Sequence, residues 1–243
     1  MRIVTVIQAR TGSTRLPGKV LLELCGEPIL VRHYGRTSRA RTVDDVVIAT
    51  TTEPADDGIG ELCAARGYAC FRGSETDVLD RHYRTACQFG AEAVVRVTSD
   101  CPLIDPEIVD QAVKAFLDGQ PHLEYVSNAI PKDTFPRGLD VEVIRFDALA
   151  RAWREDRNPA WREHVTPYIY RHAELFNLGG IQCETDYSSL RWTVDTPEDF
   201  AFVTKIYESF GHDRFGWREV LRLLEQHPEW TKINRNVVQK QVE

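Results

Sequence analysis

Strand-like and helix-like segments alternate through the first half of the chain, and this order restricts the possible fold more than any other feature. Short runs rich in β-branched residues suit buried strands, and the longer segments between them have the spacing of helices. We expect strands at residues 3–8, 45–50, 68–71 and 93–97, and helices at 28–39, 56–66, 77–89 and 106–117. Repeated β-α units predict an α/β fold with a mixed, mostly parallel sheet and helices on both faces.

The second half is less regular, and its strands are expected to form a small β-rich insertion. Strands are predicted at residues 124–128, 139–144, 179–184 and 190–194, and helices at 146–154, 197–210 and 217–226. The aromatic segment 161–171 is interpreted mainly as a subunit interface, with an acceptor pocket as the alternative. Because the 243 residues contain no Ser/Gly-rich linker and no internal repeat, we expect a single domain.

The loop after the first strand carries the strongest functional signal. Gly12 and Gly18 allow the chain to turn, and Arg10, Arg15 and Lys19 place three cations in one loop. Backbone amides, hydroxyls and cations at the end of a strand suit a polyphosphate. The loop is not a Walker A loop, since five residues separate its glycines, and it lacks the glycine spacing of a dinucleotide fingerprint. The competing interpretation is a surface loop that is basic by chance.

Two aspartates are candidate ligands for magnesium. Asp100 follows the expected strand 93–97, and Asp195 precedes the expected helix 197–210. Magnesium prefers oxygen ligands and is commonly held by one or two carboxylates together with phosphate oxygens. Each aspartate also has a structural interpretation, Asp195 as a helix N-cap and Asp100 as a turn residue. Their combination with the basic loop favours the metal site.

The charge balance argues against nucleic acid as a partner. The formal net charge is −7, whereas nucleic-acid-binding domains usually carry a basic excess. We expect neither a signal peptide nor a membrane association, because no apolar run approaches the length of a membrane span. The six cysteines form no CxxC pair and have no histidine at zinc-ligand spacing, which is typical of a protein in the reducing cytoplasm.

Several motifs resemble those of the cytidylyltransferases that activate acidic sugars. Residues 8–19 are similar to the signature loop of CMP-KDO synthetase (3-deoxy-manno-octulosonate cytidylyltransferase). Residues 194–200 resemble its late magnesium motif, and residues 164–171 resemble a segment near its sugar acid. Residues 73–81 and 135–142 look more like the spore-coat polysaccharide cytidylyltransferase group. The resemblance spans roughly residues 1–205, with the motifs in the same order.

This resemblance implies a Rossmann-like, GT-A-type nucleotidyltransferase fold, CTP as the donor, Mg²⁺ as cofactor and a homodimer. Residues 1–120 would be the nucleotide-binding half, 121–190 the acceptor and dimerisation portion, and 191–243 the metal motif and C-terminal helices. Asp100 and Asp195 would hold Mg²⁺, and the expected catalytic set adds Arg10 and Lys19. The expected nucleotide contacts are Gln8, Ala9, Arg10, Thr11, Gly12, Ser13, Lys19, Arg72, Ser74 and Thr98. The expected acceptor contacts are Arg137, Asp140, Glu142, His164 and Tyr168.

The expected reaction is a nucleotidyl transfer, in which an acceptor oxygen attacks the α-phosphorus of CTP and pyrophosphate leaves. The resemblance implies a role in cell-surface polysaccharide or glycoconjugate biosynthesis, with an acidic sugar, or a phosphonate or polyol phosphate, as acceptor. Two other classes stay open. A nucleotide-sugar-dependent glycosyltransferase would be expected to carry a DxD motif, which residues 99–101 do not form, and a catalytically silent homologue would not need the intact cations and aspartates.

Four of the expected acceptor contacts have competing interpretations from the residues alone. Arg137, Asp140 and Glu142 lie on a strand-like run and would be a solvated strand face if they bind nothing. His164 would be a structural histidine.

Overall fold

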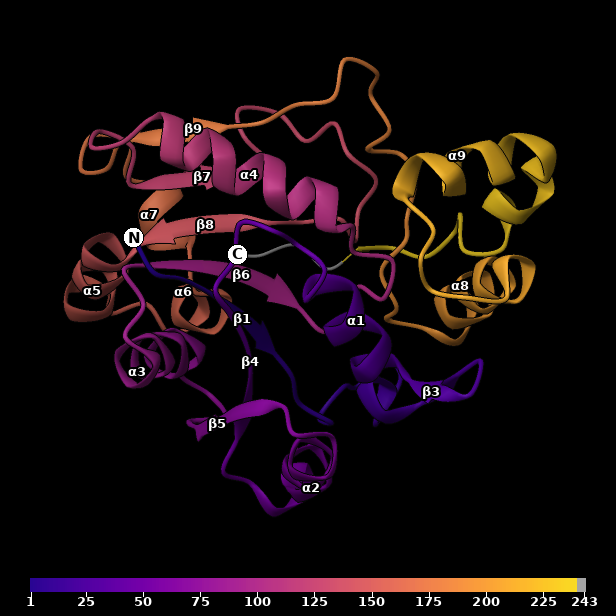
Figure 1. Ribbon diagram of the computed structural model, residues 1–243, viewed down its shortest axis with the longest axis horizontal. Helices are drawn as coiled ribbons and strands as arrows, with labels where there is room; N and C mark the ends of the chain where they lie inside the picture. The colour runs from indigo at the N-terminus through magenta and orange to yellow at the C-terminus, as the bar shows by residue number, and fades with distance from the viewer. Residues whose placement is uncertain (240–243) are drawn as a thin grey trace.

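The computed structural model describes residues 1–239 and is built around a seven-stranded sheet (Figure 1). The strand order is β5-β4-β1-β6-β8-β7-β9. The strands are β1 (Ile3–Gln8), β4 (Asp45–Thr51), β5 (Ala69–Gly73), β6 (Ala93–Thr98), β7 (Tyr125–Ser127), β8 (Glu142–Arg145) and β9 (Leu178–Gly180). Only β8 runs antiparallel to its neighbours, β6 and β7, so the predicted α/β class with a mostly parallel sheet is confirmed.

Helices cover both faces of the sheet, because alternate residues of a strand point to opposite sides. In β1, Ile3 and Ile7 belong to one apolar core, and Val4 and Val6 belong to the other. The first core includes residues of α1 (Ile29–Thr37), α2 (Asp57–Arg66), α4 (Pro106–Asp118), α8 (Pro197–Phe210) and α9 (Trp217–Gln226). The second includes residues of α3 (Val78–Phe89), α5 (Phe146–Glu155) and α7 (Pro167–Tyr170). The short helix α6 (Pro159–His164) packs beside α3 and α7.

The strands of the second half extend the central sheet instead of forming a sheet of their own. The predicted strand 139–144 is shortened to Glu142–Arg145, because the side chain of Asn128 binds the backbone of Leu139 and Val141. The predicted strand at residues 190–194 is wrong. This segment is extended, but its backbone amides bind two separate loops: Trp192 donates to Arg137 and Val194 donates to Asp100.

Helix ends follow local signals in the sequence. Gly67 and Gly90 end α2 and α3 in the left-handed conformation, with φ of 68° and 63°. Thr196, and not Asp195, is the N-cap of α8, where it forms a capping box with Asp199. The N-cap interpretation of Asp195 is therefore wrong, and its carboxylate is available to the loop that faces it.

Small elements next to the basic loop were not expected from the sequence. Lys19–Leu21 form a short 3₁₀ helix that follows Gly18, and β2 (Glu23–Leu24) and β3 (Glu27–Pro28) form a separate hairpin. Two further 3₁₀ helices lie at Pro54–Asp56 and Pro228–Lys232.

None of the helices within residues 1–239 combines the length and apolar character needed to cross a membrane.

Candidate active site

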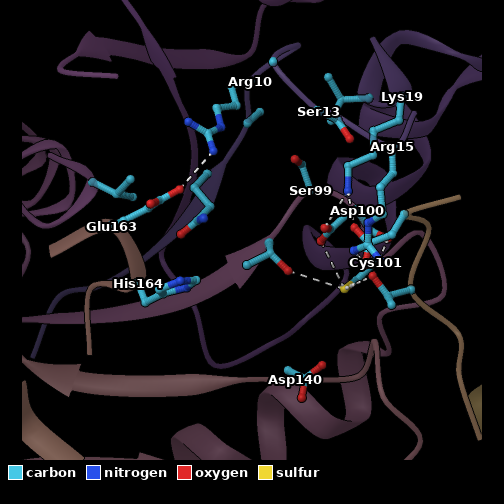
Figure 2. Close-up of a pocket in the computed structure, with 18 of the residues that line it drawn as sticks. Arg10, Ser13, Arg15, Lys19, Ser99, Asp100, Cys101, Asp140, Glu163 and His164 are labelled. Atoms are coloured by element: carbon cyan, nitrogen blue, oxygen red, sulfur yellow. Dashed lines mark hydrogen bonds and ion pairs between the residues drawn. The ribbon is translucent and has the colours of Figure 1, made fainter. Parts of the chain in front are cut away.

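A cavity of about 640 Å³ lies beyond the carboxyl ends of β1 and β6 (Figure 2). Ligands of parallel α/β sheets bind at this edge, and the two strand ends were expected to meet there. The structure brings twelve of the predicted site residues into its lining: Gln8, Ala9, Arg10, Gly12, Ser13, Lys19, Thr98, Asp100, Arg137, Asp140, His164 and Asp195.

Lys19 is the centre of the site. Its Nζ donates hydrogen bonds to Asp100 Oδ2 at 2.8 Å, to Asp195 Oδ1 at 2.8 Å and to the carbonyl of Val194 at 2.9 Å. Lys19 is only 8% exposed. An ammonium has three hydrogen-bond donors, and these three bonds satisfy all of them without water. A loop after β1 is thereby tied to a residue after β6 and to another that precedes α8.

This arrangement shifts the ionisation of its members. Burial alone would raise the pKa of Asp100, but the charge and hydrogen bond of the Lys19 ammonium outweigh it and lower that pKa to about 2. Burial would lower the pKa of Lys19, but the two aspartates raise it instead. The ammonium and the Asp100 carboxylate therefore both stay charged at neutral pH.

Two arginines hold Asp195 from its other side. Asp195 Oδ2 lies 2.9 Å from Arg15 Nη2 and 2.8 Å from Arg191 Nη2. Arg191 also donates from Nε to Asp199 Oδ1 at 2.8 Å, and Asp199 is fully buried. Sequence reasoning counted Arg15 among the loop cations that suit a polyphosphate but did not pair it with Asp195, and it missed Arg191, which has no local motif.

The donor set of Asp100 and Asp195 fits a magnesium ion completed by substrate phosphates. Their carboxylates converge on one cation, the Lys19 ammonium, which shows that both reach a common position. No group of three or more His, Cys, Asp or Glu side chains within residues 1–239 is placed to hold a metal. Two carboxylates are what magnesium commonly takes from a protein when phosphate oxygens supply further ligands.

The basic loop is shaped by one of its own residues. Thr11 donates from its amide and its hydroxyl to Asp56 Oδ1, at 2.6 and 2.7 Å. The carbonyl of Thr11 accepts from the amides of Ser13 and Gly18, at 2.7 and 2.9 Å. These bonds give Thr11 a structural role, and Thr11 does not line the cavity with its neighbours. The nucleotide contact expected of it stays a prediction.

Arg72 and Ser74 also lie outside the cavity lining. The Arg72 guanidinium is held by the carbonyls of Thr51 and Glu53, at 2.8 and 3.2 Å, and pairs with Asp57. Ser74 accepts from the amide of Asp77 and thereby shapes the turn before α3. Both residues therefore make local structural contacts, and the nucleotide contacts expected of them stay predictions.

A nearby arginine that was not predicted does line the cavity. Arg81 is 1% exposed, and its Nη1 donates to the carbonyl of Ser74 at 2.5 Å. Its Nε has no hydrogen-bond partner among the described residues. The sequence signal was the place of this arginine in α3, three residues after the buried Val78 and four before the buried Thr85.

The end of the cavity opposite Lys19 is formed around Arg96 and His164. Arg96 donates to Gln8 Oε1 at 3.1 Å and pairs with Glu142. Arg10 pairs with Glu163 at 3.1 Å, and His164 lies next to this pair (Figure 2). Burial, with the nearby Arg96 charge, lowers the pKa of His164. Sequence reasoning missed Arg96, although an arginine inside the valine-rich strand Ala93–Thr98 is an unusual residue in such a position.

Glu142 and Tyr168 were predicted to contact the acceptor, and neither lines the cavity. Glu142 lies behind Arg96 and accepts from Tyr125 Oη at 2.5 Å and from Thr166 Oγ1 at 2.6 Å. The hydroxyl of Tyr168 donates to Glu155 Oε2 at 2.9 Å, and its ring packs against His172 and Phe176. Glu142 supports the wall of the cavity, and Tyr168 belongs to a different surface.

Arg137 and Asp140 enter the cavity from the loop before β8. The Arg137 guanidinium makes no hydrogen bond or ion pair with any residue between 1 and 239. Asp140 Oδ2 accepts from the amide of Gly138 at 2.8 Å, and burial raises the pKa of this carboxyl. The charge of Arg137 acts on Asp140 and Asp133, so the loop presents to a ligand one cation without a hydrogen bond and one carboxyl.

Comparison with known proteins places these features in a family context. Residues 4–227 match the sequence model of the family described as Cytidylyltransferase. The chain is 33% identical to the spore coat polysaccharide biosynthesis protein SpsF of Bacillus subtilis, over 93% of this chain and 95% of that protein. It is 42% identical to a 3-deoxy-manno-octulosonate cytidylyltransferase of Geobacter sulfurreducens, over 46% of this chain and 44% of that enzyme.

A solved structure extends the likeness to three dimensions. The structure of a cytidylyltransferase from Leptospira borgpetersenii superposes with a TM-score of 0.91, at 33% identity, over 99% of this chain and all of that chain. Both resemblances expected from the sequence motifs are confirmed, and the one to the spore-coat group extends over nearly the whole chain.

Proposed function

This chain belongs to the cytidylyltransferase family and is a nucleotidyltransferase, and we propose that it transfers CMP from CTP to an acidic sugar or a related anionic acceptor. The observation that carries the proposal is the placement of Lys19 between Asp100 and Asp195 at the carboxyl edge of the sheet. This placement joins the basic loop, whose cations suit a polyphosphate, to two carboxylates that suit a metal ion, in one cavity.

The transfer exchanges one bond at the α-phosphorus for another, and basic residues of the chain stabilise the leaving group. The acceptor oxygen forms a bond to the α-phosphorus of CTP, the bond from that phosphorus to the pyrophosphate oxygen breaks, and the acceptor proton passes to solvent. Arg10, Arg15 and Lys19 neutralise charge that develops on the leaving pyrophosphate. One such preorganised donor typically contributes about 10²–10³-fold to a rate. No covalent enzyme intermediate is needed.

Asp100 and Asp195 are the residues that would hold magnesium. When bound, Mg²⁺ neutralises charge on the phosphates and makes the attacking hydroxyl more acidic. Before substrate binds, the three hydrogen bonds of Lys19 hold the loop and the two carboxylates in fixed positions relative to one another.

The side chain of Arg137 is the evidence that the acceptor is negatively charged. It is a half-buried cation that lines the cavity and makes no hydrogen bond or ion pair within residues 1–239, so a ligand carboxylate or phosphonate would have its hydrogen-bond donors available. Asp140 beside it accepts hydrogen bonds, which suits the hydroxyls of a sugar. A related enzyme named for 3-deoxy-manno-octulosonate, a sugar acid, agrees with this chemistry. The relative named for spore coat polysaccharide biosynthesis supports a cell-surface pathway. A homodimer and a cytoplasmic location remain predictions.

The test is pyrophosphate release with Mg²⁺, each of the four nucleoside triphosphates, and a panel of sugar acids, sugar phosphates, polyol phosphates and phosphonates. We expect release with CTP and an acidic acceptor only. Lys19→Met and Asp100→Asn should each lower the rate at least about 100-fold. The matched control is Asp118→Asn, an exposed carboxylate at the end of α4. Release with no pair, or rates equal to wild type in both site variants, would contradict the proposal.

A further inference from the structure

The chain returns to the cavity after its last helix. Beyond α9 and the 3₁₀ helix Pro228–Lys232, the backbone runs back toward the central strands (Figure 1). We call residues 234–239 the C-terminal strap. Asn234 anchors it: this residue is 4% exposed, and its Nδ2 donates to the carbonyl of Arg191 and to Asp199 Oδ1, both at 2.9 Å. The strap thus starts from the same buried network that holds Asp195.

The far end of the strap contacts the two arginines that pair with Asp195. Arg15 Nη1 donates to the carbonyl of Val238 at 3.2 Å, and Arg191 Nη1 donates to Gln239 Oε1 at 2.5 Å. Gln239 also lines the cavity. Each guanidinium is therefore held from two sides, by Asp195 on one and by the strap on the other.

These contacts are polar and make little use of apolar burial. The side chain of Val238 is 82% exposed, so hydrophobic packing does not explain why the strap reaches this place. The strap supplies two hydrogen-bond acceptors, the carbonyl of Val238 and the side-chain amide oxygen of Gln239. They accept from the Nη1 atoms of Arg15 and Arg191. An arginine side chain loses conformational freedom when it binds a ligand, so Arg15, which lines the cavity and is already held, should bind its ligand more tightly.

We propose that the C-terminal strap is a positioning element for triphosphate binding, which fixes Arg15 and Arg191 beside Asp195 and closes this side of the cavity through Gln239. The inference rests on the proposed function, because it takes the Arg15–Lys19 side of the cavity as the place of the β- and γ-phosphates. CMP lacks those phosphates. The strap therefore matters for CTP and not for CMP.

The experiment compares the full chain with two truncations and one point variant. The truncation Δ237–243 removes Val238 and Gln239, and Δ240–243 is its matched control because it keeps the whole strap. Gln239→Ala removes one contact without shortening the chain. Affinities for CTP and CMP are measured by calorimetry with Mg²⁺ and no acceptor, and kcat and KM for CTP are measured separately.

We expect Δ237–243 to weaken CTP binding about tenfold and to raise the KM for CTP by a similar factor, as the loss of hydrogen bonds to charged groups predicts. CMP affinity and melting temperature should stay close to those of the full chain. Gln239→Ala should weaken CTP binding about threefold, and Δ240–243 should match the full chain.

Other results overturn the strap proposal. Unchanged or tighter CTP binding in Δ237–243, or equal losses for CTP and CMP, would mean that the strap does not position cations for the triphosphate. If Δ237–243 does not fold, Gln239→Ala decides the question, and wild-type CTP affinity in that variant overturns the proposal. Absence of CTP binding by the full chain would instead reject the proposed function, so the two failures are distinguishable.

Discussion

At the scale of single residues, the site is organised by one ammonium between two carboxylates. Asp100 and Asp195 would repel each other without a cation between them, and Lys19 supplies that cation from a nearly buried position. Removing one member of a buried charge network leaves the others uncompensated. The proposed magnesium site uses the same two aspartates, so under that proposal the ammonium and the metal ion would compete for them when no nucleotide is present.

Lys19→Met should therefore change metal and nucleotide binding in opposite directions. With the competing ammonium gone, Mn²⁺ used as a spectroscopic probe should bind the free protein about tenfold more tightly, which corresponds to about 1.4 kcal/mol. CTP should bind more weakly, because a phosphate contact is lost. Electron paramagnetic resonance titration measures the free metal, and Lys114→Met, an exposed position on α4, is the control. Weaker Mn²⁺ binding in Lys19→Met would show that the lysine and the metal do not share a position.

At the scale of elements, the part of the cavity lined by Arg137 and Asp140 depends on a close contact between two loops. Gly138 has φ of +103°, and a Cβ there would lie 2.6 Å from the amide nitrogen of Thr193 and 2.8 Å from the carbonyl carbon of Trp192. Its neighbour Arg137 accepts from the amide of Trp192 at 2.7 Å. Only glycine allows this approach, so the loop that carries Arg137 and Asp140 is fixed against the segment before Asp195.

Gly138→Ala should disrupt this contact and strongly lower the free energy of unfolding. Strained backbone of this kind costs about 1–3 kcal/mol, and the clash with backbone atoms adds to it. We expect a lower urea midpoint and a higher KM for the acceptor, with a smaller change in the KM for CTP. Gly58→Ala in α2 is the control, because its Cβ would lie 3.6 Å from the Leu21 side chain and alanine favours a helix. A Gly138→Ala enzyme with wild-type stability and acceptor KM would refute this role of the glycine.

Elements with strong local signals were predictable, and elements made by distant contacts were not. The bounds of α8 and α9 match the predicted helices, since their apolar spacing and Pro197 are local features. Residues 190–194 have the composition of a strand, but their hydrogen bonds go to loops more than 50 residues away in the sequence. In the site, the basic loop and both aspartates were predicted from local motifs. Arg81, Arg96 and Arg191 were not, because only the folded chain brings them to the cavity or to Asp195.

At the scale of the whole molecule, the two apolar cores enclose polar groups that are stable only in one ionisation state. His82 of α3 is fully buried against the second face of the sheet, and its Nδ1 donates to the carbonyl of Val78 at 2.9 Å. Its Nε2 has no partner among the described residues. Burial, together with the positive charges of Arg96 and Arg81, lowers the pKa of His82 to about 3.

This histidine should make the protein sensitive to mild acid. The unfolded chain has an ordinary histidine pKa of about 6.5 and so binds a proton that the folded state excludes. Stability contributed by the neutral ring is present above pH 6.5 and falls as the pH drops toward 3, by about 1.4 kcal/mol per unit, or nearly 3 kcal/mol by pH 4.5. Urea unfolding of wild type and His82→Leu between pH 7 and 4.5 measures this difference. His33, also buried, and the carboxylates titrate in both proteins, so the wild type should lose more stability by that amount, and parallel pH profiles would show that His82 is not the group responsible.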